Sequence, residues 1–142
     1  IDEKSLNVSK SANDICDYIL TNHTEDLIKK LKPINKKIFY HGPCQLRSHG
    51  MGQPAVKLLR LIPNISLTIS NADCCGIGGT FGYSKSNSII SKEISQTLLN
   101  QVNSNNPEII LCDSETCRWN IEKSSGVKTL HPIEIIASSL NL

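Results

Sequence analysis

Four short apolar runs, separated by stretches with helical periodicity, constrain the fold of this chain most strongly. Such runs are typical of buried strands, which are predicted at residues 36–41, 65–69, 107–112 and 127–130. Helices are predicted at residues 11–32, as one long helix or two short ones broken near 21–24, and at 54–62, 86–102, 119–123 and 132–140. This alternation predicts an α/β fold: a small parallel sheet of about four strands, with helices on both faces and right-handed crossovers.

Length and composition exclude several classes of protein. A chain of 142 residues buries roughly two thirds of its unfolded surface, so it folds without disulfide bonds and leaves its cysteines free for chemistry. No run of about 18 apolar residues offers a membrane span. The net charge is +2 and aromatic residues make up 4% of the chain, which gives no basis for nucleic-acid binding.

The N-terminal part of the chain differs from the rest in composition. Residues 1–36 are expected to form a helical segment that packs on, or leads into, a cysteine-rich domain at residues 37–142. The first residue is not Met and no apolar signal-peptide core follows it, so we expect a fragment of a longer cytoplasmic subunit. In a reducing compartment, clustered cysteines are more often metal-binding or catalytic than disulfide-bonded.

Five of the six cysteines indicate the function. They are Cys44, the adjacent pair Cys74 and Cys75, and Cys112 with Cys117. Cys44, the pair and Cys117 each follow a predicted strand, at the carboxyl edge where open α/β sheets bind ligands. Two adjacent cysteines bind one tetrahedral ion poorly, whereas neighbouring irons of a cluster can take one sulfur each. The pattern therefore favours iron and sulfur over zinc.

Several other residues have simpler interpretations than a direct role in the site. Cys16 lies on the first predicted helix and is interpreted as a core thiol. The glycines that begin at Gly76 do not match a dinucleotide loop, because Phe81 occupies the place of its third glycine. They are expected instead to let backbone N–H groups approach cluster sulfurs. His41 and His131 end two predicted strands and are interpreted as structural neighbours of the site rather than ligands.

At this point the sequence resembles a known family, the cysteine-rich domain with a Cys-Cys-Gly motif. The resemblance covers about residues 38–140 and depends on residues 40–44, 58–63, 74–83, 116–122 and 131–132. The family occurs in the B subunit of heterodisulfide reductase and in the C subunit of anaerobic glycerol-3-phosphate dehydrogenase. The chain is more similar to the second cysteine-rich domain of the latter.

The resemblance implies a cluster site and also shows a departure from the family. The family pattern is one cysteine, a Cys-Cys pair and then Cys-x-x-Cys, which maps onto Cys44, Cys74, Cys75, position 114 and Cys117. These residues hold an iron–sulfur cluster in the family, in the best-understood cases a non-cubane [4Fe-4S] assembly. Position 114 is serine here. Three interpretations stay open: Cys112 compensates, the Ser114 oxygen ligates, or the site is vestigial.

The resemblance also implies a role. The leading hypothesis is a non-flavin electron-transfer subunit that passes electrons from a flavin-containing dehydrogenase subunit towards quinone, at the cytoplasmic face of the cell membrane. Membrane association would then be peripheral and would occur through the complex. A second hypothesis is a structural zinc domain that docks subunits, since four thiolates suffice for zinc. A third hypothesis is a heterodisulfide-type thiol reductase subunit.

Overall fold

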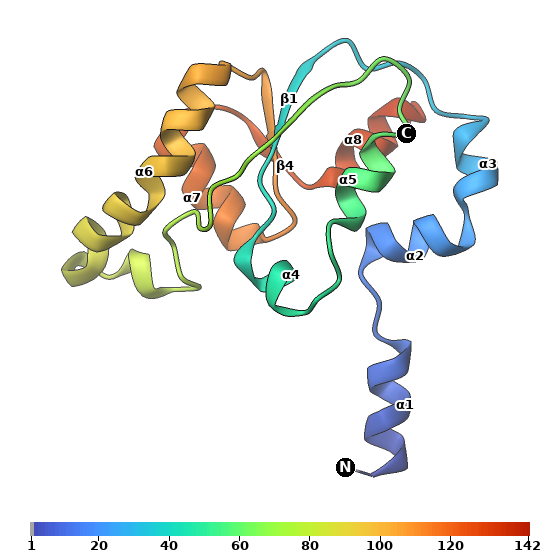
Figure 1. Cartoon of the computed structure of the whole chain (residues 1–142), viewed down its shortest axis with the longest axis horizontal. Helices are drawn as coiled ribbons and strands as arrows, with labels where there is room; N and C mark the ends of the chain where they lie inside the picture. Colours follow the sequence, from blue (N-terminus) through green and yellow to red (C-terminus); the bar gives the residue numbers. More distant parts are fainter. Residues whose placement is uncertain (1) are drawn as a thin grey trace.

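A four-stranded parallel sheet organises the protein, whose computed structural model describes residues 2–142 (Figure 1). The strands are β1 (Lys37–Tyr40), β2 (Ser66–Ile69), β3 (Ile109–Leu111) and β4 (Thr129–Leu130). Their order across the sheet is β2-β1-β3-β4, and every neighbouring pair is parallel. The predicted α/β fold with a parallel sheet is therefore confirmed.

Helices cover both faces of this sheet, as predicted. They are α1 (Glu3–Ser11), α2 (Ile15–Asn22), α3 (Thr24–Ile28), α4 (Cys44–Ser48), α5 (Pro54–Leu59), α6 (Ser88–Asn105), α7 (Glu115–Ser125) and α8 (Pro132–Ser139), with the 3-10 turns η1 (Phe81–Tyr83) and η2 (Lys85–Asn87) before α6. Local chemistry sets several ends. The Asp14 carboxylate caps α2, Pro132 begins α8, and Gly126 ends α7 with a φ of 71°.

The region 11–32 forms two short helices, α2 and α3, that meet at His23, which is one of the two predicted alternatives. Helix α1 lies ahead of that predicted stretch; an Asp2 cap begins it, it buries none of its residues, and it extends away from the domain (Figure 1). Helix α7 begins at Glu115 rather than at the predicted residue 119, so Cys117 lies on the helix and not before it.

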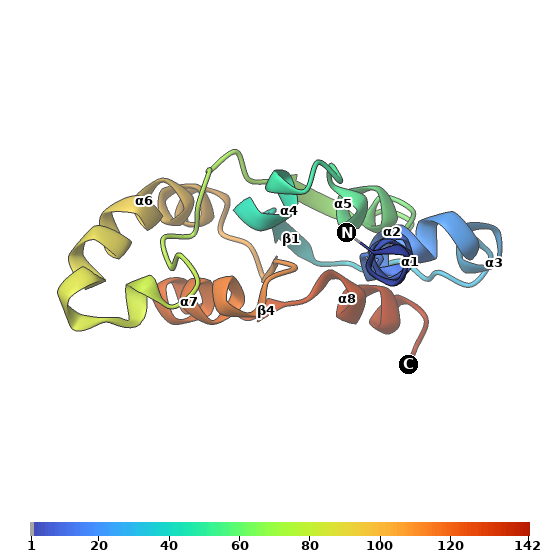
Figure 2. The same cartoon turned by 90° about the horizontal axis from the view of Figure 1, so that it is seen from below.

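The sheet separates two hydrophobic cores, because successive side chains of a strand point to opposite faces. Ile38 and Tyr40 of β1 pack with α2, α5 and α8, whereas Phe39 packs with α6 and α7. Figure 2 shows these two groups of helices on opposite sides of the strands. Within residues 2–142 we find no helix that is both long enough and apolar enough to cross a membrane.

Candidate metal centre

The segments that follow β1, β2 and β3 at the carboxyl edge of the sheet carry the five clustered cysteines. Cys44 is the first residue of α4 after β1, Cys74 and Cys75 follow β2, and Cys112 directly follows β3. Main-chain bonds extend the ladder beyond the strands: His41 N–H donates to Leu111 O at 2.9 Å, and Cys112 N–H donates to Leu130 O at 3.0 Å. The sheet register therefore fixes where each loop starts.

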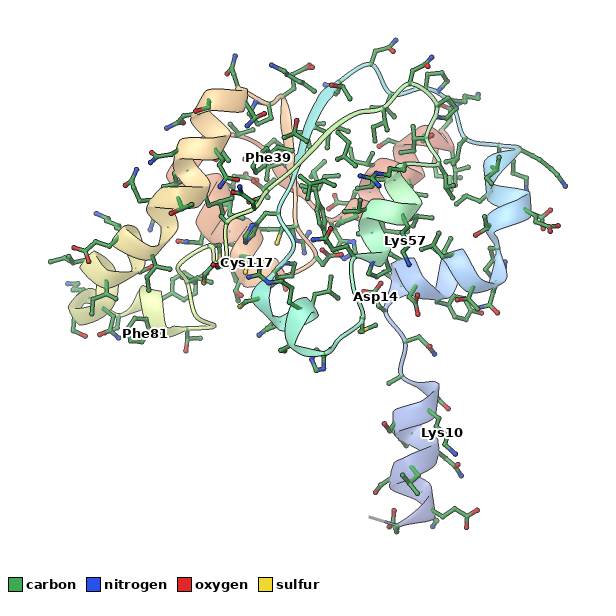
Figure 3. The ribbon with its side chains drawn as sticks, viewed as in Figure 1. Lys10, Asp14, Phe39, Lys57, Phe81 and Cys117 are labelled. Atoms are coloured by element: carbon green, nitrogen blue, oxygen red, sulfur yellow. The ribbon has the colours of Figure 1, made fainter. Side chains whose placement is uncertain are left out.

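The side chains of these cysteines converge. The thiols of Cys75 and Cys112 both hydrogen-bond to Cys117, which lies in the first turn of α7. Cys44 is hydrogen-bonded to the Cys74 side chain and interacts electrostatically with Cys117. Figure 3 shows Cys117 at the end of the sheet where α4 begins. These interactions join Cys75, Cys112 and Cys117 as one group and Cys44 and Cys74 as another, at the same edge of the sheet.

The converging sulfurs share their protons unequally. Hydrogen bonds from Cys112 and then Cys75 lower the pKa of Cys117 to about 3. The same bonds, together with burial, raise the pKa values of Cys75 and Cys112. Burial and the neighbouring Cys74 and Cys117 sulfurs raise the pKa of Cys44. Cys117 is therefore the thiol of this group that its neighbours favour most for losing a proton.

Backbone N–H groups surround the sulfurs, as expected for the glycine-containing loop. Gly76 N–H donates to Cys74 Sγ at 3.3 Å, and Ile77 N–H donates to the Cys75 sulfur. On the other loops, Gln45 N–H donates to the Cys44 sulfur and Ser114 N–H donates to the Cys112 sulfur. Such bonds stabilise negative charge on sulfur, and in iron–sulfur proteins they help to set the reduction potential.

Gly76 has a packing role that its sequence position did not reveal. Its φ is +89°, and a Cβ at this position would overlap the main-chain carbonyl oxygen of Ser91 in α6. Only glycine therefore allows the Cys74-Cys75 loop to approach the backbone of α6. By contrast, Gly79 also has a positive φ of +64°, but a Cβ there would meet no atom within 4 Å.

Cys112 and Ser114 occupy different positions relative to the sulfurs. Cys112 is fully buried and its thiol contacts Cys117 directly. The Ser114 side chain also hydrogen-bonds to the Cys117 sulfur and lies 3.4 Å from Thr116 Oγ1. Ser114 is the N-cap residue of α7, but its hydroxyl does not cap the helix. Both residues thus reach the Cys117 sulfur, Cys112 with a thiol and Ser114 with a hydroxyl.

Two polar side chains that the sequence analysis did not single out brace the cysteine loops. Arg47 of α4 hydrogen-bonds to the Asp73 carbonyl and contacts its carboxylate at 3.4 Å, which ties the helix of Cys44 to the residue before Cys74. Asn120 of α7 donates to the Cys75 carbonyl at 2.8 Å. Each lies three residues after a cysteine on its helix, Arg47 after Cys44 and Asn120 after Cys117. That one-turn spacing is the sequence signal for both, since such residues share a helix face.

The two histidines have different surroundings. His131 caps α8. Its ring Nδ1 accepts from the main-chain N–H of Ile133 at 3.2 Å, and its main-chain N–H donates to Glu134 Oε1 at 2.7 Å. His41 is fully buried beside Ser70, with burial lowering its pKa to about 4. Its Nε2 has no hydrogen-bond partner among residues 2–142. The neutral imidazole of His41 therefore presents a free nitrogen near the cysteines.

A cavity of about 430 Å³ opens next to the cysteine loops. Its lining includes Pro43 and Gln45 on either side of Cys44, and Asp113 and Ser114 directly after Cys112. Asp113 accepts a hydrogen bond from the buried Tyr40 hydroxyl at 2.7 Å, and burial raises the pKa of its carboxyl group. The cavity thus borders the neighbours of Cys44 and Cys112, but none of the clustered cysteines lines it.

The sixth cysteine lies elsewhere, as predicted. Cys16 of α2 is fully buried in the core formed by α2, α5 and α8, where burial raises its pKa to about 12. As they stand, no three His, Cys, Asp or Glu side chains in the described part of the chain surround the position of a single metal ion. The five clustered cysteines are arranged as a group of contacting thiols and backbone donors.

Sequence comparisons place these observations in a family. The chain belongs to the cysteine-rich domain family, whose pattern matches residues 38–122. It is 38% identical over 110 residues to the C subunit of the anaerobic glycerol-3-phosphate dehydrogenase of Escherichia coli (strain K12), an alignment that covers 78% of this chain and 28% of that protein.

Two further relatives extend the comparison. Lactate utilization protein A 2 of Bacillus cereus (strain 03BB102) is 24% identical over 146 residues, covering 98% of this chain and 59% of the relative. The glycolate oxidase iron-sulfur subunit of Escherichia coli (strain K12) is 26% identical over 141 residues, covering 97% and 33%. This chain therefore spans less than two thirds of each relative. No solved structure matches it significantly.

Proposed function

We propose that this domain holds an iron–sulfur cluster of the [4Fe-4S] type and serves as an electron-transfer domain of an oxidoreductase. The proposed ligands are Cys44, Cys74, Cys75 and Cys117, with Cys112 in place of the family cysteine at position 114. The observation that carries the proposal is the gathering of five cysteines at one edge of the sheet, where the thiols of Cys75 and Cys112 hydrogen-bond to Cys117.

The residues present fit such a group chemically. Iron–sulfur clusters are held mainly by thiolates, and the site offers five sulfurs, one more than a tetrahedral zinc ion uses. Adjacent Cys74 and Cys75 suit two neighbouring irons better than one ion. Of the five sulfurs, Cys44, Cys74, Cys75 and Cys112 accept a backbone N–H bond from Gln45, Gly76, Ile77 and Ser114 respectively. These donors are available to offset the negative charge of a thiolate-bound cluster.

The cluster would supply one-electron transfer, and the protein would supply position and environment. The sheet and α7 hold the buried sulfurs of Cys75, Cys112 and Cys117, which are at most 6% exposed, away from bulk water. Cys44 is exposed and marks the side from which electrons would enter or leave. His41 offers an uncharged N–H or nitrogen beside the sulfurs, which suits a role in tuning their charge.

The relatives support the oxidoreductase context of the proposal. Two of them carry the names of a dehydrogenase subunit and an oxidase iron-sulfur subunit. We therefore propose flavin-containing dehydrogenase subunits as partners, glycerol 3-phosphate as the source of electrons and quinone as their destination. In this proposal the chain reaches the cytoplasmic face of the membrane through its complex.

Anaerobic reconstitution with ferrous iron and sulfide tests the proposal. We expect a brown protein that binds iron and sulfide, shows visible absorption, and gives an EPR signal in one redox state. Cys75→Ala and Cys112→Ala should each retain little iron. Cys16→Ala is the matched control, because it also removes a buried thiol but lies on the other face of the sheet, so its iron content should equal that of the unchanged protein.

Two outcomes would replace the proposal with a different function. A colourless protein with stoichiometric zinc, lost equally in Cys75→Ala and Cys44→Ala, would establish a structural zinc domain. Turnover of a low-molecular-weight disulfide by the metal-free protein would establish a thiol reductase, a function that the low pKa of Cys117 favours and its burial opposes.

A further inference from the structure

A second cavity, of about 520 Å³, lies between the η1–η2 segment, α6 and α7. No cysteine lines it. Its walls combine exposed lysines with polar side chains such as Ser91, Ser95 and Asn120. A volume of this size is typical of sites for small molecules.

The charge of this cavity is of one sign. Lys85, Lys92 and Lys123 line it, and no Asp or Glu does. None of these three lysines forms an ion pair within residues 2–142. Two carboxylates adjoin these lysines in sequence, Glu93 beside Lys92 and Glu122 beside Lys123, and neither lines the cavity. Glu122 pairs with Lys128 at 3.8 Å and accepts from Thr129 N–H at 2.8 Å. Three ammonium groups around one cavity repel each other, and an anion between them would relieve that repulsion.

A buried hydroxyl group adds an unused donor to the same wall. Ser91 is only 6% exposed, and its hydroxyl makes no hydrogen bond with the described residues, whereas the neighbouring Ser95 hydroxyl donates to Lys92 O at 2.8 Å. Ser91 Oγ faces Gly82, where an added Cβ would overlap it. The Ser91 hydroxyl is thus free to donate to an acceptor in the cavity.

We propose that this lysine cavity binds a small oxyanion of the phosphate class, either inorganic phosphate or the phosphate group of a small molecule. Lysine ammonium groups bind phosphate as point charges, and the Ser91 hydroxyl supplies a directed hydrogen bond. Asn120, which lines the cavity with one side and donates to the Cys75 carbonyl, connects the anion site to the Cys74-Cys75 loop.

Titration with inorganic phosphate at constant ionic strength, followed by amide NMR of the whole 142-residue chain, tests this site. We expect saturable shifts at Gly82 and Ser91. The double variant Lys92→Gln/Lys123→Gln should weaken binding at least about tenfold. Lys10→Gln/Lys57→Gln is the matched control: it removes the same charge from exposed positions outside the cavity, visible in Figure 3, and should leave the affinity unchanged.

Ser91→Ala distinguishes a specific site, in which the hydroxyl donates to the anion, from non-specific attraction of anions by the lysines. It leaves the charge unchanged and should still weaken phosphate binding several-fold. A simple phosphate monoester, titrated in parallel, distinguishes the two sources of the ligand: tighter binding than inorganic phosphate indicates a phosphorylated small molecule. Shifts that do not saturate, or an equal loss of affinity in the Lys10→Gln/Lys57→Gln control, would overturn the proposal. Neither result depends on whether the cysteines hold a cluster.

Discussion

The two faces of the sheet bury cysteine in opposite ways. On the face covered by α2, α5 and α8, Cys16 is a single thiol among aliphatic side chains, and burial raises its pKa to about 12. On the face covered by α6 and α7, Cys117 is also buried, yet its pKa falls to about 3 because two thiols donate to it. Burial alone therefore does not set the pKa of a cysteine; the hydrogen bonds donated to its sulfur also do.

The two faces also differ in whether their core residues belong to the candidate site. The α2/α5/α8 face contains only one cysteine among the described residues and includes the fully buried Leu58 and Leu59. The α6/α7 face includes Cys75, Cys112 and Cys117 in its core, so its packing and its site share residues. We expect changes on the first face to affect folding alone and changes on the second to affect both folding and metal retention.

The largest effect is expected from Gly76→Ala, which changes the loop that packs against α6 on the α6/α7 face. The new Cβ would meet the Ser91 carbonyl at a positive φ, so the Cys74-Cys75 loop must move away from α6. We expect a loss of about 3 kcal/mol or more in the free energy of unfolding, with reduced iron retention. Denaturant unfolding and iron analysis measure the two effects.

Two controls sharpen this comparison. Gly79→Ala places a Cβ at a positive φ, but the space around it is free. It should therefore lower the free energy of unfolding by only about 1 kcal/mol. Leu58→Ala, on the α2/α5/α8 face, should cost about 3 kcal/mol through an internal cavity while leaving iron retention unchanged. Loss of iron in the folded Leu58→Ala protein would show that the two faces are not independent.

A pH-dependent effect of intermediate size is expected from Cys16. An ordinary thiol ionises near pH 9, whereas folded Cys16 holds its proton until about pH 12. Because the folded pKa is raised, this contribution to stability is complete below pH 9 and is lost as the pH rises from 9 to 12. Unfolding of the unchanged protein and Cys16→Ala across this range measures it. Parallel stability curves for the two proteins would refute the raised pKa.

The smallest effect is expected at position 114. Ser114→Cys adds a thiol where the Ser114 hydroxyl already reaches Cys117, and we expect iron retention to increase by at most about tenfold. Ser114→Ala should reduce it slightly, because one hydrogen bond to Cys117 is lost. Iron and sulfide per chain after identical anaerobic reconstitution provide the measurement. If Ser114→Cys and the unchanged protein bind equal iron, position 114 is not a ligand position here.

The fold and much of the candidate site could be predicted from sequence patterns, for identifiable physical reasons. Apolar runs such as Ile109–Leu111 indicate buried parallel strands, and parallel strands place their carboxyl ends on one edge. That shared edge predicts the convergence of Cys44, the Cys74-Cys75 pair and Cys117. The start of α7 was mispredicted because the helical stretch 115–118 carries no apolar periodicity, and α1 was missed because its polar residues form a helix that buries no side chain.

The sequence by itself determined the sheet, the edge and the set of five cysteines, because these follow from periodicity and residue type. Only the tertiary structure decided the rest. It directed the Cys112 thiol to Cys117, placed Gly76 against the backbone of α6, and gave Arg47 and Asn120 their bracing contacts. Each of these depends on the distance between segments that packing brings together. Packing of the whole domain sets such distances, and a local pattern such as the one-turn spacing of Arg47 or Asn120 from a cysteine does not identify the partner segment.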